Sequence, residues 1–438
     1  AGFQDRCIQP LCHLSEGGEC YLILPGKQEQ ITNFRYYSLN DFPISPRPIS
    51  MPRLVFPDNI SSREFLRDYW QQKPLLMRGA LEDYEFPLSA DELGGLSCEE
   101  EVESRLVIEH GVTPWELRHG PFDEAVFSGL PEDHWTLLVQ DVDKYVPQVR
   151  ELLRLFEFVP SWRIDDIMIS YAENGGSVGA HTDTYDVFLI QAMGKRRWQI
   201  STDDFSHAEL IPDLSVRVLK EFCPQQEWVL EPGDILYLPP GVAHWGISQG
   251  ECMTYSLGCR APSEREMIAD FTDYLLQHIP EQLHYLDPPL EPQENPGEIR
   301  APIFERTRRR LAHWLDDPAM IRRWFGCFCT EPKAHLVIDP PQQALDEQQL
   351  LSMLQQRQFL YPHPFARFAF ATLGLDRIQL FACGQYFELP ADCHELAAML
   401  CRSIEMDCQQ LKPWTDTAAG SFVLLELYNL GYLGFDYA

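Results

Sequence analysis

Two histidines and one aspartate are the residues of this chain whose types and spacing best suit a metal site. His181 and Asp183 are two positions apart, and His244 follows 61 positions after Asp183 (244 − 183). Alternate side chains of a strand point to the same side, so the His181 imidazole and the Asp183 carboxylate should converge on one point. A His-x-Asp triplet alone is frequent by chance, so the setting of the second histidine carries the interpretation.

The segment 231–244 gives that second histidine a defined setting. Its sequence is EPGDILYLPPGVAH, in which a Pro-Gly-Asp turn, an apolar strand and a Pro-Pro-Gly break precede His244. Two histidines and a carboxylate on one face of an octahedral ion leave three positions open, as in non-haem Fe(II) oxygenases. Either histidine alone would more often be an ordinary core or surface residue. The pair in these contexts favours the metal site.

A short cationic run at 194–198, GKRRW, follows the ligand pair. Alternation places Arg196 and Trp198 on one face of a strand, and a cation that points into a barrel is costly unless it meets an anion. A guanidinium can grip a carboxylate with two parallel hydrogen bonds, and the distal carboxylate of 2-oxoglutarate is a suitable partner. Ser170, on an earlier strand, is a further candidate donor to that carboxylate. The alternative is that the three cations 195–197 are all surface charges.

Short apolar or alternating runs separated by Gly and Pro fill the region from about 162 to 260, and these must position the candidate ligands. They are 167–171, 187–190, 198–200, 235–238 and 253–257. Many short strands at close spacing predict an antiparallel barrel or a double-sheet jelly roll.

Helical patterns lie on both sides of this region. One is expected over 62–70, one from Ser263 with Glu266 completing a capping box, and two more over 303–315 and 318–329. Apolar stripes on the helices after the barrel suggest a docking or dimerisation module. The domains expected are a poorly ordered leader (1–50), a catalytic domain (51–262), a helical region (263–335) and a C-terminal unit (336–438).

The charge of the chain limits its partners. The formal net charge is −31, with 35 basic and 66 acidic side chains, so nucleic acid is a poor ligand and a basic protein a plausible one. The pattern of the C-terminal unit suits a small winged helix. That unit carries 5 basic and 12 acidic residues, a net of −7 (5 − 12), which favours protein contact over DNA binding.

Cysteine usage and hydropathy bear on the compartment. Thirteen scattered cysteines predict reduced thiols in a cytoplasmic protein, and no apolar run is long enough to span a membrane. The leader carries Cys7, Cys12, His13 and Cys20, for which a small zinc site is conceivable. A poorly ordered leader, or translated sequence upstream of a start at Met51, is the preferred interpretation.

Three phrases resemble the JmjC-type 2-oxoglutarate oxygenases of the cupin superfamily, and within them the bacterial ribosomal oxygenases that hydroxylate an arginine. They are WRIDDIMIS at 162–170, HTDTYDVF at 181–188 and YSLGCRAP at 255–262. The resemblance extends over nearly everything after residue 50. Many JmjC proteins have a lysine at this position. This chain has Arg196 instead, and the bacterial subgroup likewise has an arginine there.

The resemblance implies an α+β protein: a double-stranded β-helix barrel, a helical dimerisation region and a C-terminal winged-helix-like domain. It implies Fe(II) at His181, Asp183 and His244, with 2-oxoglutarate and dioxygen as cosubstrates and Arg196 and Ser170 as cosubstrate ligands. The implied partners are a second copy of the chain and a basic ribosomal protein, the sixteenth of the large subunit, hydroxylated at an arginine β-carbon. Apart from the resemblance, Tyr185 and Asp186 lie just past the ligand pair and are candidates for holding a cationic substrate side chain.

Other outcomes stay open at this point. The same scaffold can serve a histidyl hydroxylase or a methyl-lysine demethylase, and a cupin need not be an oxygenase at all.

Overall fold

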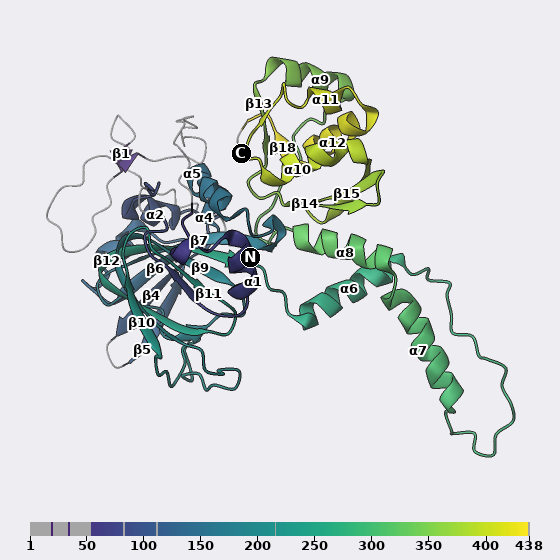
Figure 1. The fold of residues 1–438 in the computed structure, drawn as a ribbon, viewed down its shortest axis with the longest axis horizontal. Coiled ribbons are helices and arrows are strands. Elements are labelled where there is room, and N and C mark those ends of the chain that lie inside the picture. The colour runs from purple at the N-terminus through teal and green to yellow at the C-terminus, as the bar shows by residue number, and fades with distance from the viewer. Residues whose placement is uncertain are drawn as a thin grey trace, which may run out of the picture. The chain divides into compact units, whose positions relative to one another are not determined.

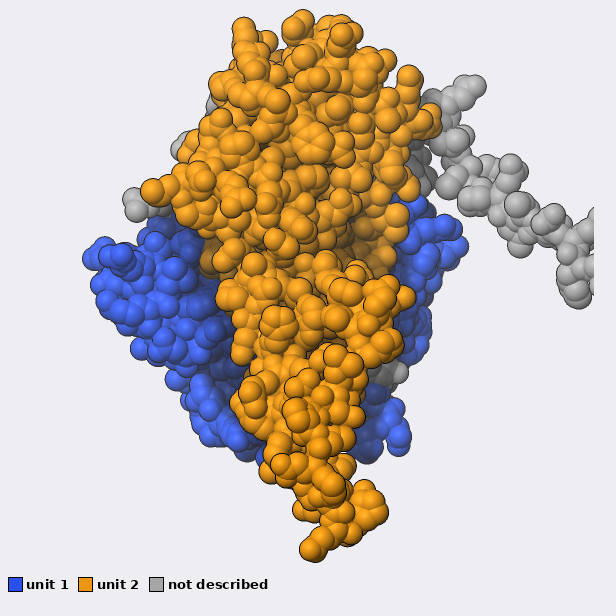
Figure 2. Space-filling view, turned by 90° about the vertical axis from the view of Figure 1, so that its right-hand side faces the viewer, with its two compact units in different colours: residues 1–158, 166–258 blue, residues 159–165, 259–438 orange. Residues whose placement is uncertain are grey.

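The computed structural model describes residues 54–81, 84–110, 113–214 and 216–436. It also describes the backbone of two short strands that pair with each other, β1 (Glu19–Cys20) and β2 (Phe34–Arg35). The expected leader and the candidate zinc ligands Cys7, Cys12, His13 and Cys20 fall outside the described side chains, so those predictions stay as they were. The chain divides into two compact units, residues 1–158 with 166–258 and residues 159–165 with 259–438 (Figure 2).

The first unit is built on one ten-stranded sheet (Figure 1). Its strands are β3 (Leu75–Met77), β4 (Ser104–His110), β5 (Thr113–His119), β6 (Trp135–Val139), β7 (Ile164–Ala172), β8 (His181–Thr182), β9 (Val187–Ser201), β10 (Gln226–Leu230), β11 (Ile235–Leu238) and β12 (Ala243–Cys259). The order is β3-β11-β9-β12-β7-β6-β4-β5, with β10 beside β9 and β8 beside β12. The antiparallel strand pairs agree with the expected β architecture.

The two long central strands let one sheet serve both halves of the barrel. β9 pairs with β11 over residues 187–190 and with β10 over 196–200, while β12 runs antiparallel to it throughout. Between these stretches Gly194 has φ +62°, and a Cβ there would lie 1.9 Å from the Glu251 carbonyl oxygen. Only glycine permits this approach. The runs 187–190 and 198–200, expected as separate strands, are therefore one bent strand.

Short helices accompany the sheet. They are α1 (Ser62–Asp68), α2 (Ala90–Leu96), α3 (Glu124–Ser128), α4 (Val142–Tyr145) and α5 (Pro147–Glu151), with 3-10 turns at Pro57–Asn59, Leu152–Phe156 and Ser161–Arg163. α1 begins at a capping box formed by Ser61 and Glu64 and ends two residues before the expected 70. Tyr69 already leaves the helical backbone at φ −124°, and Gln71 after it is left-handed at φ +58°.

The second unit contains the predicted helices after the barrel. They are α6 (Glu264–His278), α7 (Ala301–Leu315) and α8 (Pro318–Thr330). The capping box of Ser263 and Glu266 is present at the start of α6, as expected. α7 begins two residues earlier than expected because Pro302 fits the first turn of a helix, where no intrahelical N–H partner is needed.

The C-terminal part combines small sheets with helices around its own core. Its elements are α9 (Glu347–Gln356), β13 (Phe359–Pro362), β14 (Phe368–Leu373), β15 (Arg377–Ala382), β16 (Gln385–Pro390), a 3-10 turn at Ala391–Cys393, α10 (His394–Arg402), β17 (Met406–Asp407), α11 (Lys412–Thr415), α12 (Ala418–Asn429) and β18 (Leu433–Gly434). Leu350, Leu380, Leu396 and Leu427 are fully buried in one apolar cluster. Among the described helices of the whole chain, none has the length and hydropathy to span a membrane.

Candidate metal centre

β8 and β12 bring the two candidate histidines side by side. His181 and His244 are direct partners in the antiparallel pairing of these strands. Alternation alone had suggested that Asp183 lies on the same strand as His181. β8 ends at Thr182, however, so Asp183 lies in the turn that follows. Its backbone is held from the other side, because the Gly241 N–H donates to the Asp183 carbonyl at 2.8 Å. The Pro-Pro-Gly break therefore fixes Asp183 as well as leading to His244.

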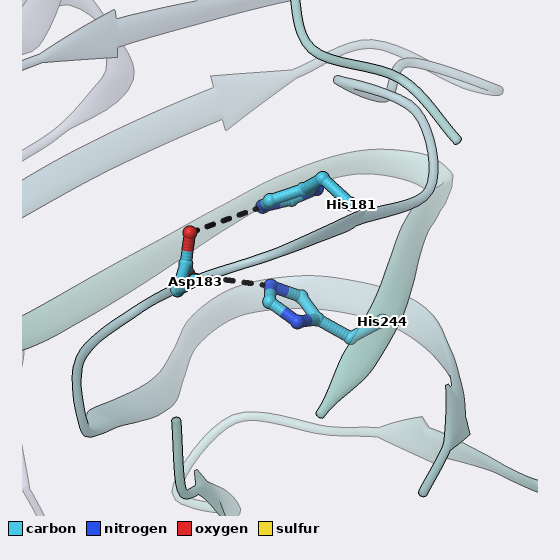
Figure 3. Close-up of side chains that lie close together, drawn as sticks. All are labelled: His181, Asp183 and His244. Carbon is cyan, nitrogen blue, oxygen red and sulfur yellow. Dashed lines mark ion pairs between the residues drawn. The ribbon is translucent and has the colours of Figure 1, made fainter. Parts of the chain in front are cut away.

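The three side chains point toward one another (Figure 3). Their nearest donor atoms all lie within 4.8 Å. The Asp183 carboxylate is 3.9 Å from His181 Nε2 and 3.6 Å from His244 Nε2. Those distances are too long for hydrogen bonds, and an ion with bonds of about 2.1 Å would draw ligand atoms to about 3 Å apart. The donor set therefore fits a metal ion with only small side-chain movements.

Backbone carbonyls orient both imidazoles. Nδ1 of His181 lies 3.0 Å from the Gly179 oxygen, and Nδ1 of His244 lies 3.0 Å from the Val242 oxygen. A proton on Nδ1 completes each hydrogen bond and leaves the Nε2 lone pair free to bind a metal. Nothing in the sequence pattern pointed to these two carbonyls, since backbone acceptors leave no residue-type signal.

Burial keeps His244 neutral. Its side chain is 3% exposed, and this burial, with the neighbouring His181, lowers its pKa from 6.5 to about 4 against the opposing effect of Asp183. Metal ligands must be deprotonated. His244 therefore meets that condition at neutral pH before any ion binds.

The stability of the metal-free protein should consequently depend on pH. Below about 6.5 the unfolded chain protonates His244, while the folded chain does so only near 4. The free energy of unfolding should thus fall as the pH drops from about 6.5 to about 4. Urea unfolding of the metal-free protein across this window measures it, with His244→Asn as comparison. Parallel pH profiles for the two proteins would refute the assignment.

Arg196 lies inside the barrel. It is 6% exposed, and its Nη1 donates to Ser170 Oγ at 3.2 Å. Its Nε and Nη2 have no hydrogen-bond partner among the described residues. A buried cation with idle donors is costly, and an anion such as a carboxylate would satisfy it. The alternative of three surface cations therefore fails for Arg196, whereas Lys195 is exposed and paired with Glu231.

Some neighbours of the site differ from the sequence expectations. Asp186 is fully buried and cannot reach a substrate, while Tyr185 is 38% exposed. Leu219, in the loop before β10, also supports the site, because its N–H donates to the Ala180 carbonyl beside His181 at 2.8 Å. This loop lacks any motif that would have marked it in advance.

Two family models match the chain: a JmjC domain over residues 151–267 and a ROXA-like winged helix over residues 311–434. The chain is similar to the ribosomal protein uL16 3-hydroxylase of Escherichia coli (strain K12), at 37% identity over 297 residues, 68% of this chain and 79% of the relative. It is 38% identical over 221 residues to a probable ribosomal oxygenase of Haemophilus influenzae, which covers 50% of this chain and 54% of that protein.

A solved structure is also similar. It is that of YcfD, a ribosomal oxygenase from Escherichia coli, in complex with cobalt and 2-oxoglutarate. The match has a TM-score of 0.74 at 32% identity and covers 86% of this chain and 98% of that one. Together with the family models, it confirms the predicted β-helix barrel with helices and a C-terminal winged helix.

Proposed function

This chain belongs to the JmjC-type ribosomal oxygenases of the cupin superfamily, and we propose that it hydroxylates an arginine of ribosomal protein uL16 at the β-carbon. The reaction is that of an Fe(II)- and 2-oxoglutarate-dependent dioxygenase. The observation that carries the proposal is the buried, half-satisfied Arg196 guanidinium in the same barrel as the converging triad. A metal triad alone would suit many cupins. The buried Arg196 guanidinium, which can bind a second carboxylate, favours a dicarboxylate cosubstrate.

The residues divide the work in a simple way. His181, Asp183 and His244 would hold Fe(II) on one face and leave the remaining positions to cosubstrates. Arg196, with Ser170, would bind the far carboxylate of 2-oxoglutarate and so orient its keto-acid end toward the metal. When bound, Fe(II), 2-oxoglutarate and dioxygen supply the oxidising power for C–H hydroxylation. The buried His244 and the barrel wall would exclude water from that chemistry.

Charge supports a basic protein substrate. A chain with a formal charge of −31 attracts cationic partners and repels phosphate backbones, which fits a ribosomal protein better than RNA itself. A cytoplasmic location follows from that substrate and forms part of the proposal.

Mass spectrometry of the product tests the reaction. The protein is incubated with Fe(II), 2-oxoglutarate and uL16, and peptides are sequenced. We expect a gain of one oxygen atom on an arginine. Oxygen on a histidine, or loss of a methyl group from lysine, would instead assign one of the alternative activities. Absence of any 2-oxoglutarate turnover would indicate a cupin that is not an oxygenase.

The proposed domain limits are 51–262 for catalysis, 263–335 for dimerisation and 336–438 for the winged-helix-like domain. What supports a homodimer is apolar surface on α6 and α7. Ile268 and Leu276 on α6 are each 67% exposed, and Phe304 and Leu311 on α7 are each 60% exposed. Within each helix the two side chains are eight or seven positions apart and so share one face, and an exposed apolar helix face typically marks a protein interface. A second copy of this chain is the proposed occupant.

Light scattering of purified protein checks this prediction. The wild type should have twice the monomer mass, and the double variant Phe304→Asp/Leu311→Asp should have the monomer mass, because two charges cannot be buried unpaired in an interface. Leu375→Asp is the matched control, since Leu375 is 100% exposed but lies outside the helical region. A monomeric wild type, or dissociation caused equally by the control, would refute the proposed interface.

A further inference from the structure

A fully buried carboxylate lies three residues beyond the candidate ligand Asp183. Asp186 is 0% exposed. Its Oδ1 accepts a hydrogen bond from the Tyr237 hydroxyl at 2.6 Å, and its Oδ2 accepts one from Gln71 Nε2 at 3.0 Å. The Tyr237 oxygen in turn accepts from the Gln71 backbone N–H at 2.7 Å. The three residues form a closed polar network on the face of β11 that packs against Phe65 of α1, although they are far apart in sequence.

This network connects the two segments that carry the metal ligands. Asp186 ends the turn that begins at Asp183, and Tyr237 lies on β11, seven residues before His244. The Asp186–Tyr237 bond therefore joins these segments on one side. The bond from the Gly241 N–H to the Asp183 carbonyl joins them again at 2.8 Å. Two cross-links over so short a length fix the separation of the Asp183 carboxylate and the His244 imidazole.

Aromatic packing fixes the network in turn. The Tyr237 ring is 4.9 Å from Phe65, 5.0 Å from Phe188 and 5.8 Å from Trp70, measured between ring centroids. A ring enclosed on several sides has no alternative rotamer, so its hydroxyl is presented to Asp186 in one position. Gln71, in a left-handed conformation after α1, contacts both other members of the network. The cost of burying a carboxylate is offset by these hydrogen bonds.

We propose that Asp186 is a positioning residue: through Tyr237 and Gln71 it sets the geometry of Asp183 relative to His244 and so determines the affinity for the metal. It does not contact the substrate. This inference rests on the proposed function, since it assigns a role within the same metal centre. Residues around metal ligands that orient them typically change metal affinity about 10- to 100-fold when they are altered. A merely structural carboxylate would change the stability of the fold instead.

Metal titration of the metal-free full-length chain tests the proposal, with Co(II) as the probe and its visible absorption as the signal. Tyr237→Phe removes one hydroxyl and keeps the ring, and Asp186→Asn keeps the shape of the side chain. Asp143→Asn is the matched control, because Asp143 is also 0% exposed and accepts a hydrogen bond at 2.8 Å, from the Ile167 N–H. It lies on α4, which carries no candidate ligand. The melting temperature is measured for every variant.

The Kd for Co(II) should rise about 10- to 100-fold in Tyr237→Phe and Asp186→Asn and stay at the wild-type value in Asp143→Asn. Unchanged Co(II) affinity in both network variants would overturn the proposal, whether or not their melting temperatures fall. A higher KM for the protein substrate at unchanged Co(II) affinity would also overturn it, in favour of substrate contact. If the wild type binds Co(II) but oxygenates no arginine, the proposed function fails while this comparison of affinities still stands.

Discussion

Replacing Asp183 by alanine should reduce the turnover of 2-oxoglutarate at least about a thousandfold, since a bound metal contributes several kcal/mol to such reactions. The carboxylate faces both histidines, 3.9 Å from His181 and 3.6 Å from His244. Without it the remaining donors are two imidazoles, which hold a divalent ion weakly. Succinate formation measures the loss.

The fold should survive this change. The Asp183 side chain is 21% exposed, and the hydrogen bond from Gly241 goes to its backbone and not to its carboxylate. Glu209→Ala serves as control, because Glu209 is a carboxylate with 76% exposure that is not a candidate ligand. It should retain full turnover. Wild-type turnover in Asp183→Ala would show that the reaction centre lies elsewhere.

Replacing Arg196 by methionine should lower kcat/KM for 2-oxoglutarate about 30-fold or more. Removing one partner of a buried, hydrogen-bonded charge pair costs about 2–5 kcal/mol, and each 1.4 kcal/mol is tenfold. Here the unpaired partner would be the cosubstrate carboxylate. Methionine keeps an unbranched side chain of similar length, so the barrel should remain packed. Initial rates at varied 2-oxoglutarate concentration give the parameter.

Arg197→Met is the matched control for this prediction. Arg197 adjoins Arg196 in sequence, but alternation turns it to the other face, where its guanidinium lies 3.9 Å from Glu227. Its loss should leave kcat/KM for 2-oxoglutarate near the wild-type value. Ser170→Ala should produce a smaller decrease than Arg196→Met, because it removes one neutral hydrogen-bond partner. Equal effects of Arg196→Met and Arg197→Met would argue against a cosubstrate contact.

The central residues of the site could be predicted from the sequence because the patterns that indicate them involve residues close together in the chain. The Pro-Gly-Asp turn and Pro-Pro-Gly break around β11 predicted a strand that ends before His244, and that strand is present. Alternation predicted that Arg196 and Trp198 share a face, and both are buried. The helix start at Ser263 followed from its capping box, which depends on residues three apart.

What the sequence could not provide depends on contacts between distant segments. Two expected strands are one strand, β9, in which Gly194 lies close to the Glu251 carbonyl of β12. No pattern of residues in the sequence indicates this contact. Asp186 was a candidate for binding a cationic side chain because it lies just past the ligand pair. Its burial follows from Tyr237 and Gln71, which are 51 and 115 positions away. The carbonyls that orient His181 and His244 are backbone groups. Every residue has one, so no residue type indicates which of them will contact an imidazole.

An anaerobic titration of the Fe(II)-loaded protein with 2-oxoglutarate tests the central claim most directly, because an Fe(II)–keto-acid chelate absorbs visible light through charge transfer. The wild type should develop this absorption and saturate at one equivalent of 2-oxoglutarate. Asp183→Ala should not develop it, and Arg196→Met should require a far higher concentration. Absence of the absorption in the wild type, or its full retention in Asp183→Ala, would contradict an Fe(II) centre formed by His181, Asp183 and His244.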